Sequence, residues 1–185
     1  MAVPSEIKKA ILNFPNDNKT TSLLIQVPPE NSLETQLFLT KKLAGRGFKI
    51  ITLSGGRPCM DLLSIYRERN INLKNVHIID LICRSQKLNV KDTENVTHMD
   101  GLRSLIEMSI HLNKMVVSNK TVLFIDSISS MLLYSNELIF TRFLSDVIQK
   151  MKVRGVHLIL LLIKTKNYDN LRAELKYLCD QEVIA

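Results

Sequence analysis

Phosphate binding is the first chemistry to test in this sequence. The stretch from Val27 to Glu34 lies between an apolar run suited to a buried strand, Ser22–Gln26, and a helical pattern that begins at about Ser32. A working phosphate loop reads G-x-x-x-x-G-K-[ST]: its glycines let backbone N–H groups approach the phosphates, its lysine reaches the terminal phosphates, and its hydroxyl holds magnesium. Here Val27 and Ser32 stand at the glycine positions, Leu33 at the lysine position and Glu34 at the hydroxyl position. The segment therefore has the outline of a phosphate loop without the residues that bind phosphate.

These replacements weaken phosphate binding strongly. Each lost charge-assisted hydrogen bond is worth roughly 1.5–3 kcal/mol, so two or three together weaken binding by about 10²–10⁴-fold. Glu30 and Glu34 also place negative charge where a polyphosphate would lie. We predict no bound cofactor; an ordinary strand–turn–helix without phosphate ancestry is the alternative. The residues that we interpret as a vestigial phosphate loop are Val27, Glu30, Asn31, Ser32, Leu33 and Glu34.

Two further places carry polar residues directly after an apolar run. Asp126 and Ser127 end the run Thr121–Ser127, where they could form a residual metal site or cap the next loop; we expect the capping role. Gly55 and Gly56, with the arginine that follows them, could form an anion-binding nest, but we expect a plain turn. The apolar segment Ile128–Tyr134 is expected to be buried in the core, although it could also cover a site or pack on a partner.

Cysteine and histidine spacing indicates no metal site and no catalytic residue. The cysteines are odd in number, far apart and without a C-x-x-C pair, which predicts neither a disulfide framework nor a zinc site. His77 and His157 lie inside apolar strands and are expected to be core histidines, whereas His98 and His111 are 13 residues apart and not at helical ligand spacing. The three cysteines are Cys59, Cys83 and Cys179.

Composition predicts one compact domain over residues 1–185, with an N-terminal helix and turn in 1–20 and an α/β core in 21–185. Hydrophobic residues make up 45% of the chain and the mean hydropathy is +0.05. The longest apolar run, Leu158–Ile163, is far shorter than the roughly 18 residues that span a bilayer, and the N-terminus lacks a signal-peptide core, so we expect no membrane contact and a cytoplasmic protein. The net charge of +7 permits nucleic-acid binding but does not favour it, because the basic residues are dispersed and the aromatics few.

Strands and helices alternate along the chain at the spacing of βαβ crossovers, which predicts a doubly wound, mostly parallel α/β sheet with helices on both faces. The expected strands are Ser22–Gln26, Phe48–Leu53, Asn75–Asp80, Thr121–Ser127, Val156–Ile163 and the edge strand Glu182–Ala185. The expected helices are Pro4–Phe14, one from about Ser32 to Ala44, Met60–Arg69, one from about His98 to Met115, Asn136–Lys152 and Asn170–Leu178.

In this order the chain resembles the ATPase core of the RecA superfamily, nearest its KaiC-like branch. Val27–Glu34 keeps the length and the proline pair of that family's GPPGSGKT loop, Ile50–Pro58 is similar to its second strand and turn, and Val122–Ser127 resembles its Walker B strand. Asn75–Asp80 and the closing Cys179–Ile184 continue the similarity.

The resemblance implies a RecA-like P-loop fold, a Walker B role for Asp126 and a catalytic carboxylate near Gly55 or Gly56, where this chain has none. We therefore expect a non-catalytic KaiC/RecA-like protein that regulates or scaffolds through a protein partner, and a homo-oligomer is one form of such contact because family members often form rings. A nucleotide-binding ATPase or switch with an atypical loop, and a basic nucleic-acid accessory protein, are the alternatives.

Overall fold

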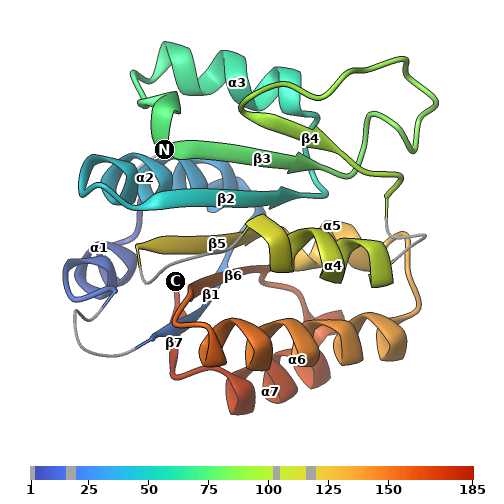
Figure 1. The fold of residues 1–185 in the computed structure, drawn as a ribbon. Helices are drawn as coiled ribbons and strands as arrows, with labels where there is room; N and C mark the ends of the chain where they lie inside the picture. Colours follow the sequence, from blue (N-terminus) through green and yellow to red (C-terminus); the bar gives the residue numbers. More distant parts are fainter. Residues whose placement is uncertain (1–2, 16–19, 102–104, 116–119) are drawn as a thin grey trace.

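The computed structural model describes residues 3–15, 20–101, 105–115 and 120–185 (Figure 1). Its centre is a sheet of seven strands in the order β4-β3-β2-β5-β6-β1-β7, and every neighbouring pair is parallel. The strands are β1 (Ser22–Val27), β2 (Lys49–Ser54), β3 (Val76–Asp80), β4 (Val96–His98), β5 (Thr121–Asp126), β6 (His157–Ile163) and β7 (Gln181–Ile184). The helices are α1 (Ser5–Leu12), α2 (Ser32–Gly45), α3 (Cys59–Glu68), α4 (Leu105–Met115), α5 (Ile128–Leu132), α6 (Glu137–Val153) and α7 (Asp169–Leu178), with 3₁₀ turns η1 (Pro29–Asn31), η2 (Leu73–Asn75) and η3 (Lys166–Tyr168).

Helices cover both faces of the sheet, and each face has its own apolar core. One core joins the strands to α4, α5, α6 and α7, and the other joins them to α1, α2 and α3. Strand β6 is buried from His157 to Leu162, as a strand between two helical layers must be. The predicted class, a parallel α/β sheet with helices on both faces, is confirmed.

Most predicted elements are found within a few residues, including the edge strand β7. The helix expected from about His98 is wrong at its start: His98 ends β4, and α4 begins at Leu105. On this helix Met108 and Leu112 face the core, whereas Ile106 and Ile110 are exposed.

Strand β4 and helix α5 are additions to the predicted elements. The segment Ile128–Tyr134, expected to be buried in the core, begins with helix α5 and has Ile128 and Met131 in the core, but the expectation is wrong for Leu133 and Tyr134, which are exposed. The turn expected after α1 falls largely on residues 16–19, outside the described part of the chain. Within the described part, no helix is both long enough and apolar enough to cross a membrane.

Loops leave the sheet in opposite directions at two places. Strand β2 leads to α3 on one face, whereas its neighbour β5 leads to α5 on the other. Strands β1 and β6 diverge in the same way, through α2 and α7. Such divergence opens a crevice at the carboxyl edge of a parallel sheet, so both places are candidates for a binding site.

Truncation of the central strand should destabilise the fold strongly. Leu160 is fully buried in β6, so Leu160→Ala leaves a cavity and is expected to lower the free energy of unfolding by about 2–5 kcal/mol. Leu133→Ala, at an exposed position, is the control and should change it by less than about 0.5 kcal/mol. Equilibrium unfolding in urea measures both, and equal effects would contradict this description of the core.

Candidate functional site

The residues from Val27 to Glu34, interpreted above as a vestigial phosphate loop, differ in their exposure and contacts. Val27 is buried inside β1, Glu30 is exposed in η1, and Leu33 packs partly against the core at the start of α2. Glu34, at the hydroxyl position, forms an ion pair with Arg69 at the end of α3, with 2.7 Å between oxygen and nitrogen. Asn31 and Ser32 are half-buried, and the Asn31 side chain makes no capping hydrogen bond to α2. No residue from Val27 to Glu34 carries a positive charge, so this turn offers a polyphosphate backbone N–H groups and two carboxylates.

Asp126 and Ser127 have separate roles. Ser127 caps α5, because its hydroxyl accepts a hydrogen bond from the Ser130 backbone N–H at 3.2 Å, as the capping prediction expected. Asp126 is only 5% exposed. Burial raises the pKa of Asp126 to about 7, against the opposing attraction of Arg57. A carboxyl that is partly protonated at neutral pH is a weak ligand for magnesium.

Gly55 and Gly56 form a turn whose backbone groups are already in use. The Gly55 N–H donates to the Asp126 carbonyl at 3.0 Å, and the Ser54 hydroxyl donates to the Arg57 carbonyl at 2.7 Å. A Cβ on Gly55 would lie 2.5 Å from Cγ of Met131. Glycine is therefore needed where α5 approaches this turn, which agrees with the plain turn predicted rather than an anion nest.

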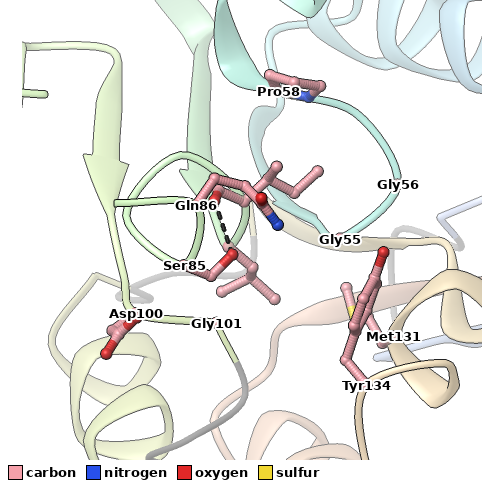
Figure 2. Close-up of a pocket in the computed structure, with 11 residues that line it drawn as sticks. Gly55, Gly56, Pro58, Ser85, Gln86, Asp100, Gly101, Met131 and Tyr134 are labelled. Atoms are coloured by element: carbon pink, nitrogen blue, oxygen red, sulfur yellow. Dashed lines mark hydrogen bonds between the residues drawn. The ribbon is translucent and has the colours of Figure 1, made fainter. Parts of the chain in front are cut away.

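A cavity of about 510 Å³ lies at the carboxyl edge, where the loops after β2 and β5 diverge (Figure 2). Its described lining contains one carboxylate, Asp100, and no lysine or arginine. This lining suits an uncharged, partly apolar ligand better than a polyphosphate. The lining residues are Gly55, Gly56, Pro58, Leu81, Ile82, Ser85, Gln86, Asp100, Gly101, Met131 and Tyr134.

Large apolar side chains are exposed in the chain that joins α5 to α6 and in the first turn of α6. Their exposed fractions lie between 57% and 75%, and Tyr134 also lines the cavity. We call this group the apolar ridge. A run of exposed apolar side chains next to a cavity is typical of a surface that contacts another protein. The ridge consists of Leu133, Tyr134, Leu138 and Ile139.

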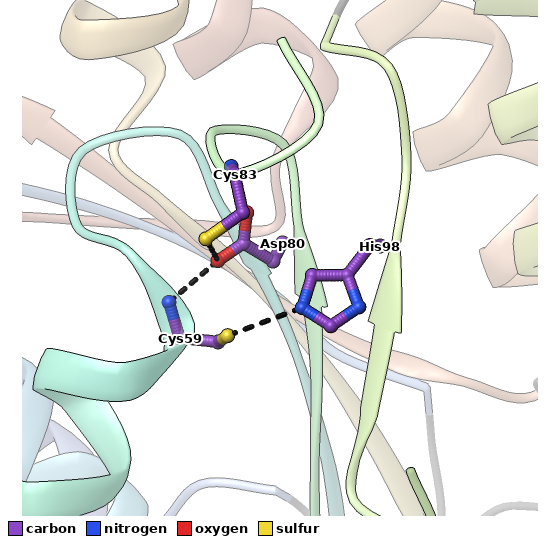
Figure 3. A group of neighbouring side chains, drawn as sticks. All are labelled: Cys59, Asp80, Cys83 and His98. Atoms are coloured by element: carbon purple, nitrogen blue, oxygen red, sulfur yellow. Dashed lines mark hydrogen bonds between the residues drawn. The ribbon is translucent and has the colours of Figure 1, made fainter. Parts of the chain in front are cut away.

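Beneath one wall of the cavity, the fold brings together four buried side chains that are distant in sequence (Figure 3). One potential ligand atom from each lies within 4.8 Å of the others. Spacing alone did not reveal this group, because its only local signal is Asp80-x-x-Cys83, in which a carboxylate replaces the first cysteine of a C-x-x-C pair. The four residues are Cys59, Asp80, Cys83 and His98.

The other histidines and Cys179 lie apart from this group. His157 accepts a hydrogen bond from the Thr21 N–H at 3.1 Å and packs edge-on against Phe14 and Phe48, so it is a core histidine as predicted. His77 is only half-buried and holds β4 through Thr97, with 3.0 Å between Nε2 and Oγ1.

Comparison with known proteins supports the fold. No protein-family model and no curated protein matches the chain. Among solved structures, it is similar to the uncharacterized protein PH0321 from Pyrococcus horikoshii, crystallised in complex with an unknown peptide. The TM-score is 0.72 at 13% sequence identity, covering 99% of this chain and 84% of that chain. At this identity the likeness extends to the α/β architecture alone.

Ionisation of Asp126 should cost stability. Because its pKa rises from 3.8 to about 7 on folding, the folded state holds a proton that the unfolded state releases, and stability falls as pH rises through this window. Asp126→Asn should remove this loss, making the variant more stable than the wild type by about 2–4 kcal/mol at pH 8 and by much less at pH 5. Urea unfolding at both pH values measures the difference.

Asp61→Asn is the matched control, since Asp61 is exposed on α3. If the difference in stability between the wild type and Asp126→Asn were the same at pH 8 as at pH 5, that result would contradict the burial of an ionisable Asp126.

Proposed function

We propose that this chain is a non-catalytic KaiC/RecA-like protein that regulates or scaffolds through protein–protein contacts. The observation that carries the proposal is the apolar ridge, which reaches the cavity through Tyr134. Its four large apolar side chains lie exposed within seven residues of the chain. A protein segment that packs on the ridge and enters the cavity would remove this apolar surface from water.

The strand order supports kinship with nucleotide-binding folds. Strand β6 lies between β1 and β5, so the turn after β1 and the acidic end of β5 share one edge at about two strand spacings, roughly 10 Å. A Walker A loop and a Walker B carboxylate need this proximity to share a magnesium ion. We therefore include a relationship to nucleotide-binding folds in what we propose.

The chemistry of the same edge argues against nucleotide turnover. Glu34 is held by Arg69, Asp126 is buried with a raised pKa, and Gly55 offers no carboxylate to polarise water. Loss of the lysine and of the glycines removes the contacts that give a phosphate loop its affinity. The positive charge of the chain does not compensate, because none of it lies within the turn.

A peptide-like segment of a partner fits the cavity. Its described lining is largely backbone and apolar surface with a few polar groups, Ser85 and Gln86 among them, which is the composition of a site that recognises an extended chain (Figure 2). The solved structure of similar fold was crystallised with an unknown peptide. That finding belongs to the other protein and supports the choice of ligand class here.

Titration with Mg-ATP tests the non-catalytic part of the proposal. We expect no heat of binding and no change in melting temperature at millimolar Mg-ATP, because the turn after β1 has no cation to hold the phosphates. Isothermal titration calorimetry and thermal unfolding measure this. A dissociation constant in the micromolar range, or steady ATP turnover that Asp126→Ala abolishes, would overturn it.

Selection from a displayed library of random peptides tests the contact surface. Tyr134→Ala removes an aromatic anchor at the cavity and should weaken a selected peptide by about 10-fold or more, since an aromatic anchor contributes on the order of 1.4 kcal/mol or more. Fluorescence anisotropy of the labelled peptide measures the affinities.

Tyr177→Ala is the matched control for the cavity, because Tyr177 is also exposed but lines a shallow hollow between α6 and α7, which shares Leu138 with the ridge and no residue with the cavity. Selected peptides that respond to Tyr177→Ala and not to Tyr134→Ala would place the contact elsewhere. A library that yields no binder, together with gel shifts that show salt-sensitive RNA or DNA binding, would replace the proposal by nucleic-acid binding.

A further inference from the structure

Two sulfurs, an imidazole nitrogen and a carboxylate oxygen converge in the interior near the cavity (Figure 3). All four residues are buried, each with no more than 5% of its surface exposed. The distance from Cys59 Sγ to His98 Nε2 is 3.4 Å, and that from Cys83 Sγ to Asp80 Oδ2 is 3.3 Å. Gathered in an apolar core, these atoms are of the kinds that proteins use to bind metal ions.

The residues sit on well-defined elements. Cys59 is the first residue of α3, Asp80 ends β3 and His98 ends β4. Cys83 lies in the turn after β3, and its N–H donates to Asp80 Oδ1 at 2.7 Å. The Ile82 N–H donates to the same oxygen at 2.7 Å. The other oxygen, Oδ2, accepts from the Cys59 N–H and faces Cys83 Sγ, so the carboxylate is fixed in orientation. The group is therefore assembled before any ligand arrives.

His98 is oriented in the way that metal-binding histidines are. Its Nδ1 lies 3.1 Å from Asp92 Oδ1, and its backbone N–H donates to the same oxygen at 2.9 Å. Arg84 holds this arrangement, since it donates to the His98 carbonyl at 2.6 Å and pairs with Asp92 at 3.1 Å. A carboxylate on one ring nitrogen leaves the other, Nε2, aimed at Cys59, which is the usual arrangement behind a zinc-bound imidazole.

We propose that Cys59, Asp80, Cys83 and His98 bind a zinc ion as a closed, structural site. Two thiolates, an imidazole and a carboxylate form a donor set suited to Zn²⁺. With usual zinc–ligand distances the edges of the tetrahedron are roughly 3.3–3.8 Å, and the two short contacts above already lie in this range. Burial of all four ligands leaves no face open to substrate, which distinguishes a structural site from a catalytic one.

The alternative interpretation is a catalytic group in which Cys59 is the nucleophile, His98 is its base and Asp92 orients the histidine. Burial, followed by the adjacent Asp80, raises the pKa of Cys59 to about 12, which favours an unreactive thiol. Cys59 is also only 3% exposed, so no substrate reaches it in this structure. A divalent cation would reverse the electrostatics, because it stabilises two thiolates beside a carboxylate.

A zinc ion at this position would link helix α3 to strands β3 and β4, and these two strands form one end of the sheet. Pro58 and Ile82, each next in sequence to a ligand, line the cavity, so the ion would also stabilise that wall. Strand β4 has three residues, all paired with β3, and a metal link would offset this short ladder. This inference does not depend on what the cavity binds.

Cobalt substitution tests the proposal in the full chain. Protein stripped with a chelator under reducing conditions and titrated with Co²⁺ should show the intense visible bands of a tetrahedral site and a sulfur-to-cobalt charge-transfer band. Both should saturate at one ion per chain and disappear when Zn²⁺ is added. Thermal unfolding should show a higher melting temperature with Zn²⁺ than without.

Substitutions locate the ion. Cys59→Ser and Cys83→Ser should each weaken the charge-transfer band, and His98→Gln should lower zinc affinity 10-fold or more. Cys179→Ser is the matched control: Cys179 follows α7, outside the group, and its replacement should leave spectrum and affinity unchanged.

Three results would overturn the site. One is a wild-type Co²⁺ spectrum without a sulfur-to-cobalt band, which decides the question even where a variant fails to fold. Another is unchanged zinc affinity in folded Cys59→Ser and Cys83→Ser proteins. The third is a Cys59–Cys83 disulfide in the purified protein, found by mass spectrometry, when the reduced protein binds no metal.

Discussion

The direction in which the chain leaves each parallel strand determines where the edge of the sheet leaves space for a ligand. All seven strands run the same way, so their carboxyl ends meet at one edge. At that edge β2 and β5 send the chain to opposite faces, and the space between their loops stays open. The cavity, the apolar ridge and the buried cysteine–histidine group all lie along this edge, because loops there are free of sheet pairing.

Close packing and charge divide the edge into two unlike halves. Near β1 the turn contains the 3₁₀ turn η1, and Glu34 forms an ion pair with Arg69 at the end of α3. Carboxylates therefore lie where a nucleotide would need cations. Near β2 the glycine at position 55 lets α5 approach, and Met131 packs against it beside the cavity. Asp126 lies between the two halves, buried and with a raised pKa. The part of this edge near β1 therefore carries carboxylates, whereas the part near β2 and β5 holds the cavity with its partly apolar lining.

Sequence patterns predicted the elements that have strong local signals. Strand β6 was predictable because its apolar run is continuous, and α6 because Asn136 caps a clear helical period, with its side chain accepting the Ile139 N–H. Strand β4 was not predictable, since three residues carry no periodicity and pair only in the folded sheet. Helix α5 is likewise too short for a period of 3.6 residues to be visible.

For binding sites, what can be predicted depends on whether the residues of the site are consecutive in the sequence. The absence of a working phosphate-loop motif from Val27 to Glu34 can be read from the sequence, because that motif consists of consecutive residues. The cavity lining comes from the ends of several strands, and the buried ligand group joins α3, β3 and β4, so both depend on topology. Asp80-x-x-Cys83 was the one local signal, and a search for cysteine pairs alone passes over it.

The place of β1 in the sheet has a consequence for biosynthesis. Strand β1 lies between β6 and β7, and its pairing with β6 places Ser22 opposite Leu158, which are 136 residues apart (158 minus 22). A ribosome adding about 5–20 residues per second needs roughly 7–27 s to make the intervening chain. During that interval β1, whose six residues are all buried in the fold and four of which are apolar, has neither of its sheet neighbours to pair with.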